Sequence, residues 1–279
     1  MSAHKPTSHF IERNNVKLHH LDWGNEGKHP VVLVHGVRLH AHVWNHFSRR
    51  YRDRFHIMAL DQRGHGESGW GHHEHYHPEE YYHDLVHMVK GRGLKRFTLI
   101  GHSLGGRVSM LFASRHPELL ERLVLVDITP GRPAGMSATA DMSRITETPP
   151  PQDYESPQEA ATYLKKIMKL APPEGIDESV EHGMRKMENG RYTWKYDPAL
   201  FRRPAPLPYN MWDVVKKITV PTLLLYGSHS NVVNKELAEQ LAATMPNCTI
   251  QRIERAGHGL FTDQPEAFAE GVGRFLGVA

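Results

Sequence analysis

The chain of 279 residues is predicted to fold as an α/β protein, with a mostly parallel sheet of eight strands and helices on both of its faces. Strand-sized and helix-sized segments alternate along most of the sequence, which is typical of parallel sheets. Residues 31–34 are continuously apolar, as a strand covered on both faces requires. The composition, 39% hydrophobic and 23% charged, excludes a disordered, collagen-like or coiled-coil chain.

The elements expected before residue 130 follow from local patterns. Residues 10–13 and 18–23 read as a hairpin, because Asn14-Asn15 between them suits a tight turn. Pro78 favours the start of a helix that ends near Gly91, since proline fits the first helical turn. The other expected elements are strands at 31–34, 56–60, 96–100 and 123–126, and helices at 42–51 and 104–115.

The alternation breaks in the middle of the chain and then resumes. Twelve of the 19 prolines lie between Pro130 and Pro208, where only helices at 157–170 and 178–189 are expected. Strands at 222–226 and 249–253 and helices at 235–244 and 264–276 follow. A connection this long is either functional or an inserted subdomain. We therefore expect a core of residues 1–129 and 209–279, with residues 130–208 forming a helical cap over the carboxyl edge of the sheet, before its last two strands.

Charge and cysteine content limit the partners and the compartment. The 34 basic and 31 acidic residues are interspersed, so no nucleic-acid partner is expected. No apolar run approaches the ~18 residues that span a bilayer, and no secretory signal is visible near the first residues, so no membrane partner is expected. The single cysteine, Cys248, cannot form an intrachain disulfide, which favours a reducing compartment, the cytoplasm.

The strongest chemical signal is Gly101-His102-Ser103-Leu104-Gly105-Gly106. It follows an expected strand directly and opens an expected helix, as a nucleophile elbow does. The sharp turn at Ser103 needs nearly side-chain-free neighbours two positions away, which Gly101 and Gly105 supply. Ser103 is the candidate nucleophile; the alternative is a glycine-rich tight turn without chemistry.

A serine nucleophile needs a base, and His258 is the best placed of the 22 histidines. It lies in Ala256-Gly257-His258-Gly259, after the last expected strand and before the last helix. Its glycine neighbours give the loop freedom to aim the ring at Ser103. His102 points away along the turn, and His229 is a weaker rival on the loop after residues 222–226.

Four motifs together resemble the α/β-hydrolase fold family, in its serine esterase branch with a cap, over essentially the full chain. They are His35-Gly36, residues 61–68 (DQRGHGES), residues 101–106 (GHSLGG) and residues 257–268 (GHGLFTDQPEAF), in the order and at the spacing usual for the family. The resemblance implies a catalytic triad of Ser103, an acid and His258. It also implies an oxyanion hole formed by the backbone N–H groups of Leu104 and Val37.

The triad acid is where the chain departs from the common pattern. Most family members place an aspartate on the loop after the first strand that follows the cap, and Ser230 stands at that position here, beside Asn231. A minority places the acid one strand earlier, where Asp127 follows the strand at 123–126. We predict Asp127 as the acid, because a serine or an asparagine cannot stabilise an imidazolium with a full charge. A cap at the start of the lid is the alternative role for Asp127, and an acid in the loop 228–231 is the alternative assignment.

The remaining candidates are weaker. Arg38 and Arg107 lie close to the oxyanion loop and the elbow, where either could bind a substrate carboxylate or brace the sheet edge. The tract at 72–77 (HHEHYH) has imidazoles that could chelate a metal, although no metal or cofactor is expected in the reaction.

The sequence thus predicts a hydrolase that cleaves a carboxylic ester, or a thioester or lactone, of a small to medium substrate through an acyl-serine. Cofactor-free haloperoxidase or perhydrolase activity and C–C bond hydrolysis use the same triad and stay open. A small-molecule receptor of the same fold is the non-enzymatic alternative. The physiological substrate and the oligomeric state are left undetermined by the sequence.

Overall fold

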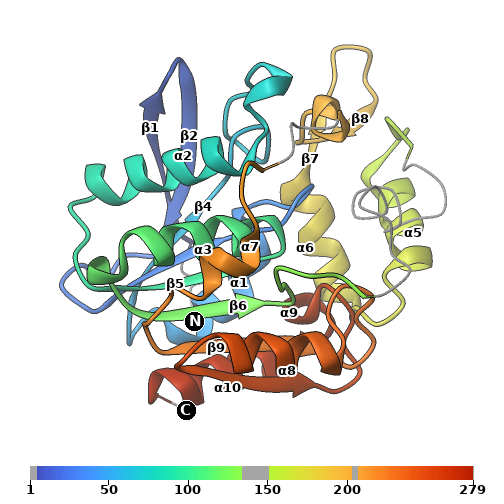
Figure 1. The fold of residues 1–279 in the computed structure, drawn as a ribbon. Coiled ribbons are helices and arrows are strands. Elements are labelled where there is room, and N and C mark those ends of the chain that lie inside the picture. Colours follow the sequence, from blue (N-terminus) through green and yellow to red (C-terminus); the bar gives the residue numbers. More distant parts are fainter. Residues whose placement is uncertain (1–4, 134–150, 203–206, 279) are drawn as a thin grey trace.

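The computed structural model describes residues 5–133, 151–202 and 207–278. They form one eight-stranded sheet with strand order β1-β2-β4-β3-β5-β6-β9-β10, with helices packed against it (Figure 1). β1 and β2 form an antiparallel hairpin and β2 is antiparallel to β4, whereas the pairs from β4 through β10 are parallel. The mostly parallel α/β sheet predicted from the sequence is therefore confirmed. The strands are β1 (Thr7–Arg13), β2 (Val16–Asp22), β3 (Pro30–Val34), β4 (His56–Leu60), β5 (Phe97–His102), β6 (Leu120–Val126), β9 (Thr222–Gly227) and β10 (Cys248–Ile253).

Helices cover both faces of the sheet, and each face has its own hydrophobic core. Successive side chains of a strand point to opposite faces, so Val32 and Val34 of β3 enter one core and Val31 and Leu33 the other. Figure 1 shows α2, α3 and α7 together on one side of the sheet. That face is covered by α2 (Pro78–Gly91), α3 (Leu104–Arg115), α7 (Met211–Val215) and α8 (Lys235–Thr244), and the other by α1 (Asn45–Tyr51), α9 (Leu260–Asp263) and α10 (Pro265–Leu276).

Most elements match the sequence expectations within a few residues, and two differences are informative. The helix expected at 42–51 begins as a 3₁₀ turn, η1 (Ala41–Trp44), before α1. The helix expected at 178–189 is wrong: α6 (Pro173–Gly183) ends at Gly183, and the chain turns into a hairpin of β7 (Met184–Lys186) and β8 (Tyr192–Trp194). Met184 pairs with Trp194 across this hairpin. Residues 184–186 therefore form a strand although their local sequence pattern predicts a helix, because pairing with β8 outweighs the local helix propensity.

Residues 151–202 form an insert between β6 and β9 along the chain. The insert contains α5 (Pro157–Ile167), α6, the β7–β8 hairpin and η4 (Pro198–Phe201), so it is not purely helical. It has a small core of its own, formed by Tyr154, Ala160, Leu164, Ile176, Val180 and Met184. Figure 1 shows α5 and α6 beyond the end toward which the β6 arrow points. Positions 134–150 and 203–206 of the predicted cap lie outside the described residues.

The loop after β4 holds the insert to the sheet. Asp197 donates its backbone N–H to the Gly64 carbonyl at 2.8 Å, and the Tyr76 hydroxyl donates to the Asp197 carboxylate at 2.5 Å. Lys195 forms an ion pair with Glu67 at 2.5 Å. The insert is thus attached through buried hydrogen bonds as well as surface charges. Within the described ranges, we find no helix with the length and apolar character needed to cross a bilayer.

Candidate active site at the carboxyl edge of the sheet

The connection between β5 and α3 has the geometry of a nucleophile elbow. Ser103 adopts φ 50° and ψ −112°, a region that side-chain-bearing residues rarely occupy. A Cβ added at Gly101 would lie 2.5 Å from the Gly105 carbonyl oxygen, and one at Gly105 would lie 2.3 Å from the Val34 carbonyl oxygen. The sharp turn therefore requires both glycines, and it presents a partly exposed Ser103 at the end of β5.

Asp127 and His258 are joined directly. Asp127 follows β6, is fully buried, and accepts a hydrogen bond from His258 Nδ1 at 2.7 Å. His258 lies in the loop between β10 and α9, with 19% of its side chain exposed. Because Nδ1 is bonded to the carboxylate, Nε2 is the ring nitrogen left to exchange a proton with another group. The pair predicted from the sequence as base and acid is thus brought together at the ends of β6 and β10, which β9 separates in the sheet.

The loop after β9 holds the Asp127 carboxylate instead of supplying a second acid. Gly227 donates its backbone N–H to Asp127 Oδ1 at 3.0 Å, and Ser230 donates its hydroxyl to Asp127 Oδ2 at 2.5 Å. His229 is exposed and its ring is bonded to the Ser228 hydroxyl at 2.9 Å. Asn231 is exposed, and no hydrogen bond to His258 is found for it in the part of the chain that the structure describes. Of the alternatives left open by the sequence, only Asp127 contacts the imidazole in this way.

His102 supports the loop that carries His258, a contact the sequence did not reveal. Its Nε2 donates to the His258 carbonyl oxygen at 3.0 Å, and the two rings lie 4.5 Å apart. Burial lowers the pKa of His102 well below its usual value, so the ring is neutral and acts as a hydrogen-bond donor that supports the His258 loop. The position of His102 beside Ser103 in the sequence does not predict this role, because His102 and His258 are 156 positions apart in the chain.

The two predicted oxyanion donors lie on segments that touch. Leu104 is the first residue of α3, where a backbone N–H has no acceptor within the helix. Gly105 donates its N–H to the His35 carbonyl at 3.1 Å, which packs the loop bearing Val37 against the elbow. A Cβ at Gly36 would lie 3.1 Å from Ser103 Cβ. The chain after β3 therefore passes directly beside Ser103.

The loop after β3 is in turn held by buried polar contacts. His35 Nδ1 donates to the Gly36 carbonyl at 2.7 Å, and its Nε2 accepts the Gln62 N–H at 3.1 Å. Asp61 is also fully buried and accepts the N–H groups of Ala41 at 2.6 Å and Glu67 at 3.0 Å. This network gives His35 a structural role in place of a catalytic one.

Arg38 and Arg107 are both half-buried near the elbow. Arg38 has φ 63° and is hydrogen-bonded to Tyr196 of the insert. Burial raises the pKa of Tyr196, and the nearby Arg38 opposes that rise. Arg107 lies one turn into α3 and donates its backbone N–H to the Ser103 carbonyl at 3.0 Å. Binding of a substrate carboxylate by either arginine stays a prediction.

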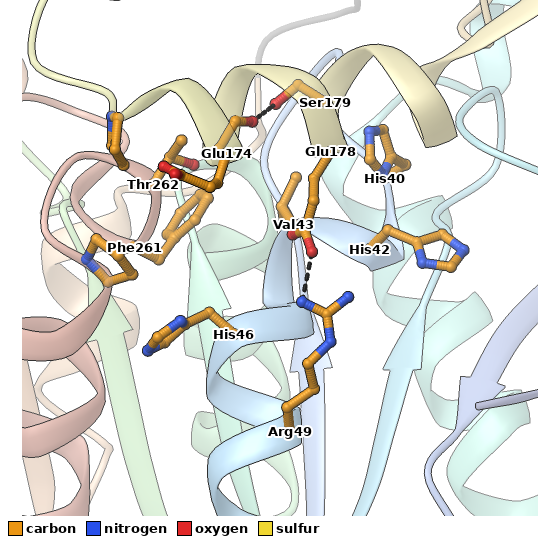
Figure 2. A pocket seen from close by; sticks show the side chains of 13 residues that line it. His40, His42, Val43, His46, Arg49, Glu174, Glu178, Ser179, Phe261 and Thr262 are labelled. Carbon is orange, nitrogen blue, oxygen red and sulfur yellow. Dashed lines mark hydrogen bonds and ion pairs between the residues drawn. The ribbon is translucent and has the colours of Figure 1, made fainter. Parts of the chain in front are cut away.

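A cavity of about 230 Å³ lies between α6 of the insert and the core segments η1, α1 and α9. Figure 2 shows side chains of α6, η1, α1 and α9 around it, with Arg49 and Glu178 pointing toward each other. These two form an ion pair at 2.5 Å. Phe261 and Thr262 of α9 line one wall, but Ser103, Asp127 and His258 do not line the cavity.

Two groups of side chains within the described ranges have ligand atoms close enough to hold a metal ion. In the predicted tract, His72, His73 and Glu74 place such atoms within 4.8 Å of one another, mostly on the surface. The other group, Asp22, Glu26 and His56, is bonded to Arg92, whose guanidinium lies 2.5 Å from Asp22. Neither group includes Ser103, Asp127 or His258.

Comparisons with curated proteins find hydrolases among the relatives of this chain. An esterase of Mycobacterium tuberculosis is 28% identical over 90% of this chain and 83% of its own length. Epoxide hydrolase 1 of Caenorhabditis elegans is 24% identical, over 96% and 70% respectively. The 2-(acetamidomethylene)succinate hydrolase of Mesorhizobium japonicum is 24% identical over 99% of both chains.

The fold is also shared with solved structures. The crystal structure of E-2-(acetamidomethylene)succinate hydrolase superposes with a TM-score of 0.87 at 22% identity, covering 98% of this chain and 99% of that one. The model of the alpha/beta hydrolase family matches residues 31–271, which include the elbow, Asp127 and His258. The chain is therefore a member of the alpha/beta hydrolase family.

Proposed function

We propose that this chain is a serine hydrolase that cleaves a carboxylic ester, or a thioester or lactone, of a small to medium substrate through an acyl-serine intermediate. The observation that carries the proposal is the 2.7 Å hydrogen bond between His258 Nδ1 and the buried Asp127 carboxylate, at the sheet edge where Ser103 stands on a strained elbow. Nucleophile, orienting acid and base follow β5, β6 and β10 at one edge of the sheet, and these are the three groups that acyl transfer by a serine uses.

In the acylation step, Ser103 Oγ attacks the carbonyl carbon of the ester while His258 Nε2 takes the hydroxyl proton. Asp127 stabilises the imidazolium that forms and keeps Nδ1 protonated. The N–H groups of Leu104 and Val37 would stabilise the oxyanion, aided by the positive end of the α3 dipole. When the tetrahedral intermediate collapses, His258 returns the proton to the leaving alcohol.

In the deacylation step, a water molecule attacks the acyl-serine carbonyl and His258 Nε2 takes a proton from that water. Collapse of the second tetrahedral intermediate releases the carboxylic acid and returns the proton to Ser103 Oγ. Every proton transfer uses His258, so no step needs a metal or a cofactor.

The relatives support a hydrolase, and the residue at the elbow guides the choice among the reactions of this fold. They include esterases and an epoxide hydrolase. Epoxide hydrolases of the fold resemble this chain but use an aspartate nucleophile, whereas Ser103 occupies the elbow here. Haloperoxidase or perhydrolase activity and C–C bond hydrolysis through the same triad are the alternative reactions, and a small-molecule receptor is the alternative without chemistry.

The test is ester turnover by the wild type, Ser103→Ala and Ser114→Ala on nitrophenyl esters of graded acyl length. We expect Ser103→Ala to lower kcat by about 10⁴-fold or more, because the nucleophile is lost. Ser114→Ala is the matched control, since Ser114 lies on the same helix and donates its hydroxyl to the Leu111 carbonyl.

A fluorophosphonate probe should label Ser103 alone, because only an activated serine reacts with it. Label on another residue, or full turnover by Ser103→Ala, would refute the serine hydrolase proposal and favour the receptor.

A further inference from the structure

We propose that Ser230 is a positioning residue for the reaction: its hydroxyl holds the Asp127 carboxylate in the orientation that supports the imidazolium of His258. This inference rests on the proposed function and goes beyond it, because Ser230 stands where most of the resembling family carries the acid itself.

The direction of the Ser230 hydroxyl hydrogen follows from its contacts. A serine hydroxyl has one hydrogen to donate and two lone pairs that can accept. Ser230 Oγ accepts the backbone N–H groups of Val232 at 3.0 Å and Val233 at 3.1 Å. Both lone pairs are therefore engaged, and the hydrogen has to point to Asp127 Oδ2, 2.5 Å away.

The same turn holds both oxygens of the carboxylate. Ser230 donates its own N–H to the Gly227 carbonyl at 3.1 Å, and the Gly227 N–H binds Asp127 Oδ1 at 3.0 Å. On the other side, the Asp127 N–H binds the Leu225 carbonyl at 2.7 Å. Since the carboxylate is fully buried, these donors replace the water that would otherwise solvate its charge. The β9 loop thus locks Asp127 in the orientation that meets His258.

The electrostatic consequence follows because Ser230 and His258 share one acceptor atom. Asp127 Oδ2 receives the Ser230 hydroxyl at 2.5 Å and His258 Nδ1 at 2.7 Å. A donor to the anionic form of a carboxylate stabilises that form and lowers its affinity for protons. Ser230 therefore helps to hold Oδ2 where it accepts His258 Nδ1, and the oriented carboxylate supports the imidazolium during the reaction.

Three other titratable groups lie close to Asp127 and His258: Asp263, His102 and His229. Asp263 accepts the Gly257 N–H at 2.8 Å, and burial, together with the negative charge of Asp127, raises its pKa. His102 contacts His258 from β5 and is neutral, and His229 on the β9 loop is bonded to Ser228 instead. Among the groups that act on Asp127, Ser230 is the neutral donor that a substitution can remove without changing net charge.

The experiment compares kcat and KM of wild type, Ser230→Ala and the equally shaped pair Ser230→Thr and Ser230→Val. Ser228→Ala is the matched control, because Ser228 lies in the same loop and bonds His229 and the Arg255 N–H. We expect Ser230→Ala and Ser230→Val to lower kcat about 3- to 30-fold with KM within about twofold, because Asp127 loses the hydroxyl that fixes it against His258 and its support of the imidazolium is needed in the transition state. Ser230→Thr and Ser228→Ala should resemble wild type.

A readout independent of turnover separates this proposal from the proposed function. The low-field proton NMR resonance of His258 Nδ1–H, identified by its loss in His258→Gln, should shift in Ser230→Val relative to Ser230→Thr, also in the Ser103→Ala background. Values of kcat and resonances of Ser230→Val that coincide with those of Ser230→Thr would overturn the role of Ser230, and so would an equal shift of the resonance in Ser228→Ala. Failure of the proposed function would appear instead as full turnover in Ser103→Ala, with the resonance result still deciding on Ser230.

Discussion

Asp127 is a fully buried carboxylate whose oxygens accept hydrogen bonds from Gly227, Ser230 and His258. Its backbone has φ 49°, a conformation that costs free energy for a residue with a side chain. A strained, buried charge persists only where its surroundings hold it in place, and here two strand ends and a tight turn do so. At the scale of single residues, the chain has therefore kept a full negative charge next to the imidazole while a serine stands at the more common acid position.

We expect Asp127→Asn to lower kcat by about 10²- to 10⁴-fold on one activated ester, because the tautomer and the imidazolium of His258 both lose support. Adding Ser230→Asp in that background should restore part of the rate, since the Ser230 hydroxyl lies 2.5 Å from the lost carboxylate oxygen. Circular dichroism of each variant controls for folding. Wild-type kcat in Asp127→Asn would show that Asp127 only caps the turn after β6.

At the scale of elements, the elbow depends on close approach of backbones. β5 and α3 meet at Ser103, and the backbone of Gly105 lies against the carbonyl oxygens of Val34 and His35 at the end of β3. A side chain there would have to push the end of β3 away from α3, because Val34 is paired in the sheet and the His35 carbonyl accepts hydrogen bonds from Gly105 and Gln62. The glycine pattern is thus a condition for the element packing as well as for the chemistry.

Gly105→Ala should destabilise the protein by about 1–3 kcal/mol, because its Cβ would lie 2.3 Å from the Val34 carbonyl oxygen. Gly91→Ala is the matched control, since Gly91 ends α2 with no atom near its added Cβ and should change stability by at most about 1 kcal/mol, in the stabilising direction. The free energy of unfolding in urea measures both. Equal stability of the two variants would contradict the crowding argument.

At the scale of the whole molecule, several of the 22 histidines are buried and neutral. Burial is the main cause that lowers the pKa of His20 to about 4, and those of His40 and His65 to about 3. A histidine with a lowered folded-state pKa stabilises the fold fully above its unfolded value of 6.5 and loses that contribution as the pH falls toward the folded value. The chain is therefore expected to be acid-sensitive in the window between these values.

The free energy of unfolding should fall between pH 7 and pH 5, with His20, His40 and His65 each contributing a loss of roughly 1–2 kcal/mol. His40→Gln should make the fall smaller, because a neutral amide takes up no proton on unfolding. His83→Gln, at an exposed position of α2, is the control and should leave the pH dependence unchanged. Parallel curves for His40→Gln and the wild type would show that His40 is not protonated on unfolding in this range.

Local sequence patterns were sufficient to predict many of the helices and strands of the core. The bounds of α2 and α3 match the prediction, because a proline favours the first helical turn and the elbow is followed directly by a helix. The helix expected at 178–189 failed, because the register between Met184 and Trp194 belongs to a pairing that a local period does not encode. Short apolar segments are ambiguous between helix and strand until a partner is present.

The sequence by itself determined the sheet class, the elbow around Ser103 and the candidate pair of Asp127 and His258, because strand alternation and glycine spacing are local requirements. Only the tertiary structure decided how Asp127, Ser230 and His258 meet, and that His102 supports the His258 loop. The sequence separation is 103 positions for the Ser230–Asp127 contact, 131 for Asp127–His258 and 156 for His102–His258. These contacts depend on the order of β5, β6, β9 and β10 in the sheet and on the directions of the loops that follow those strands. A hydrogen bond requires a distance near 3 Å, so it forms only when the strand order and the loop directions bring its two groups together.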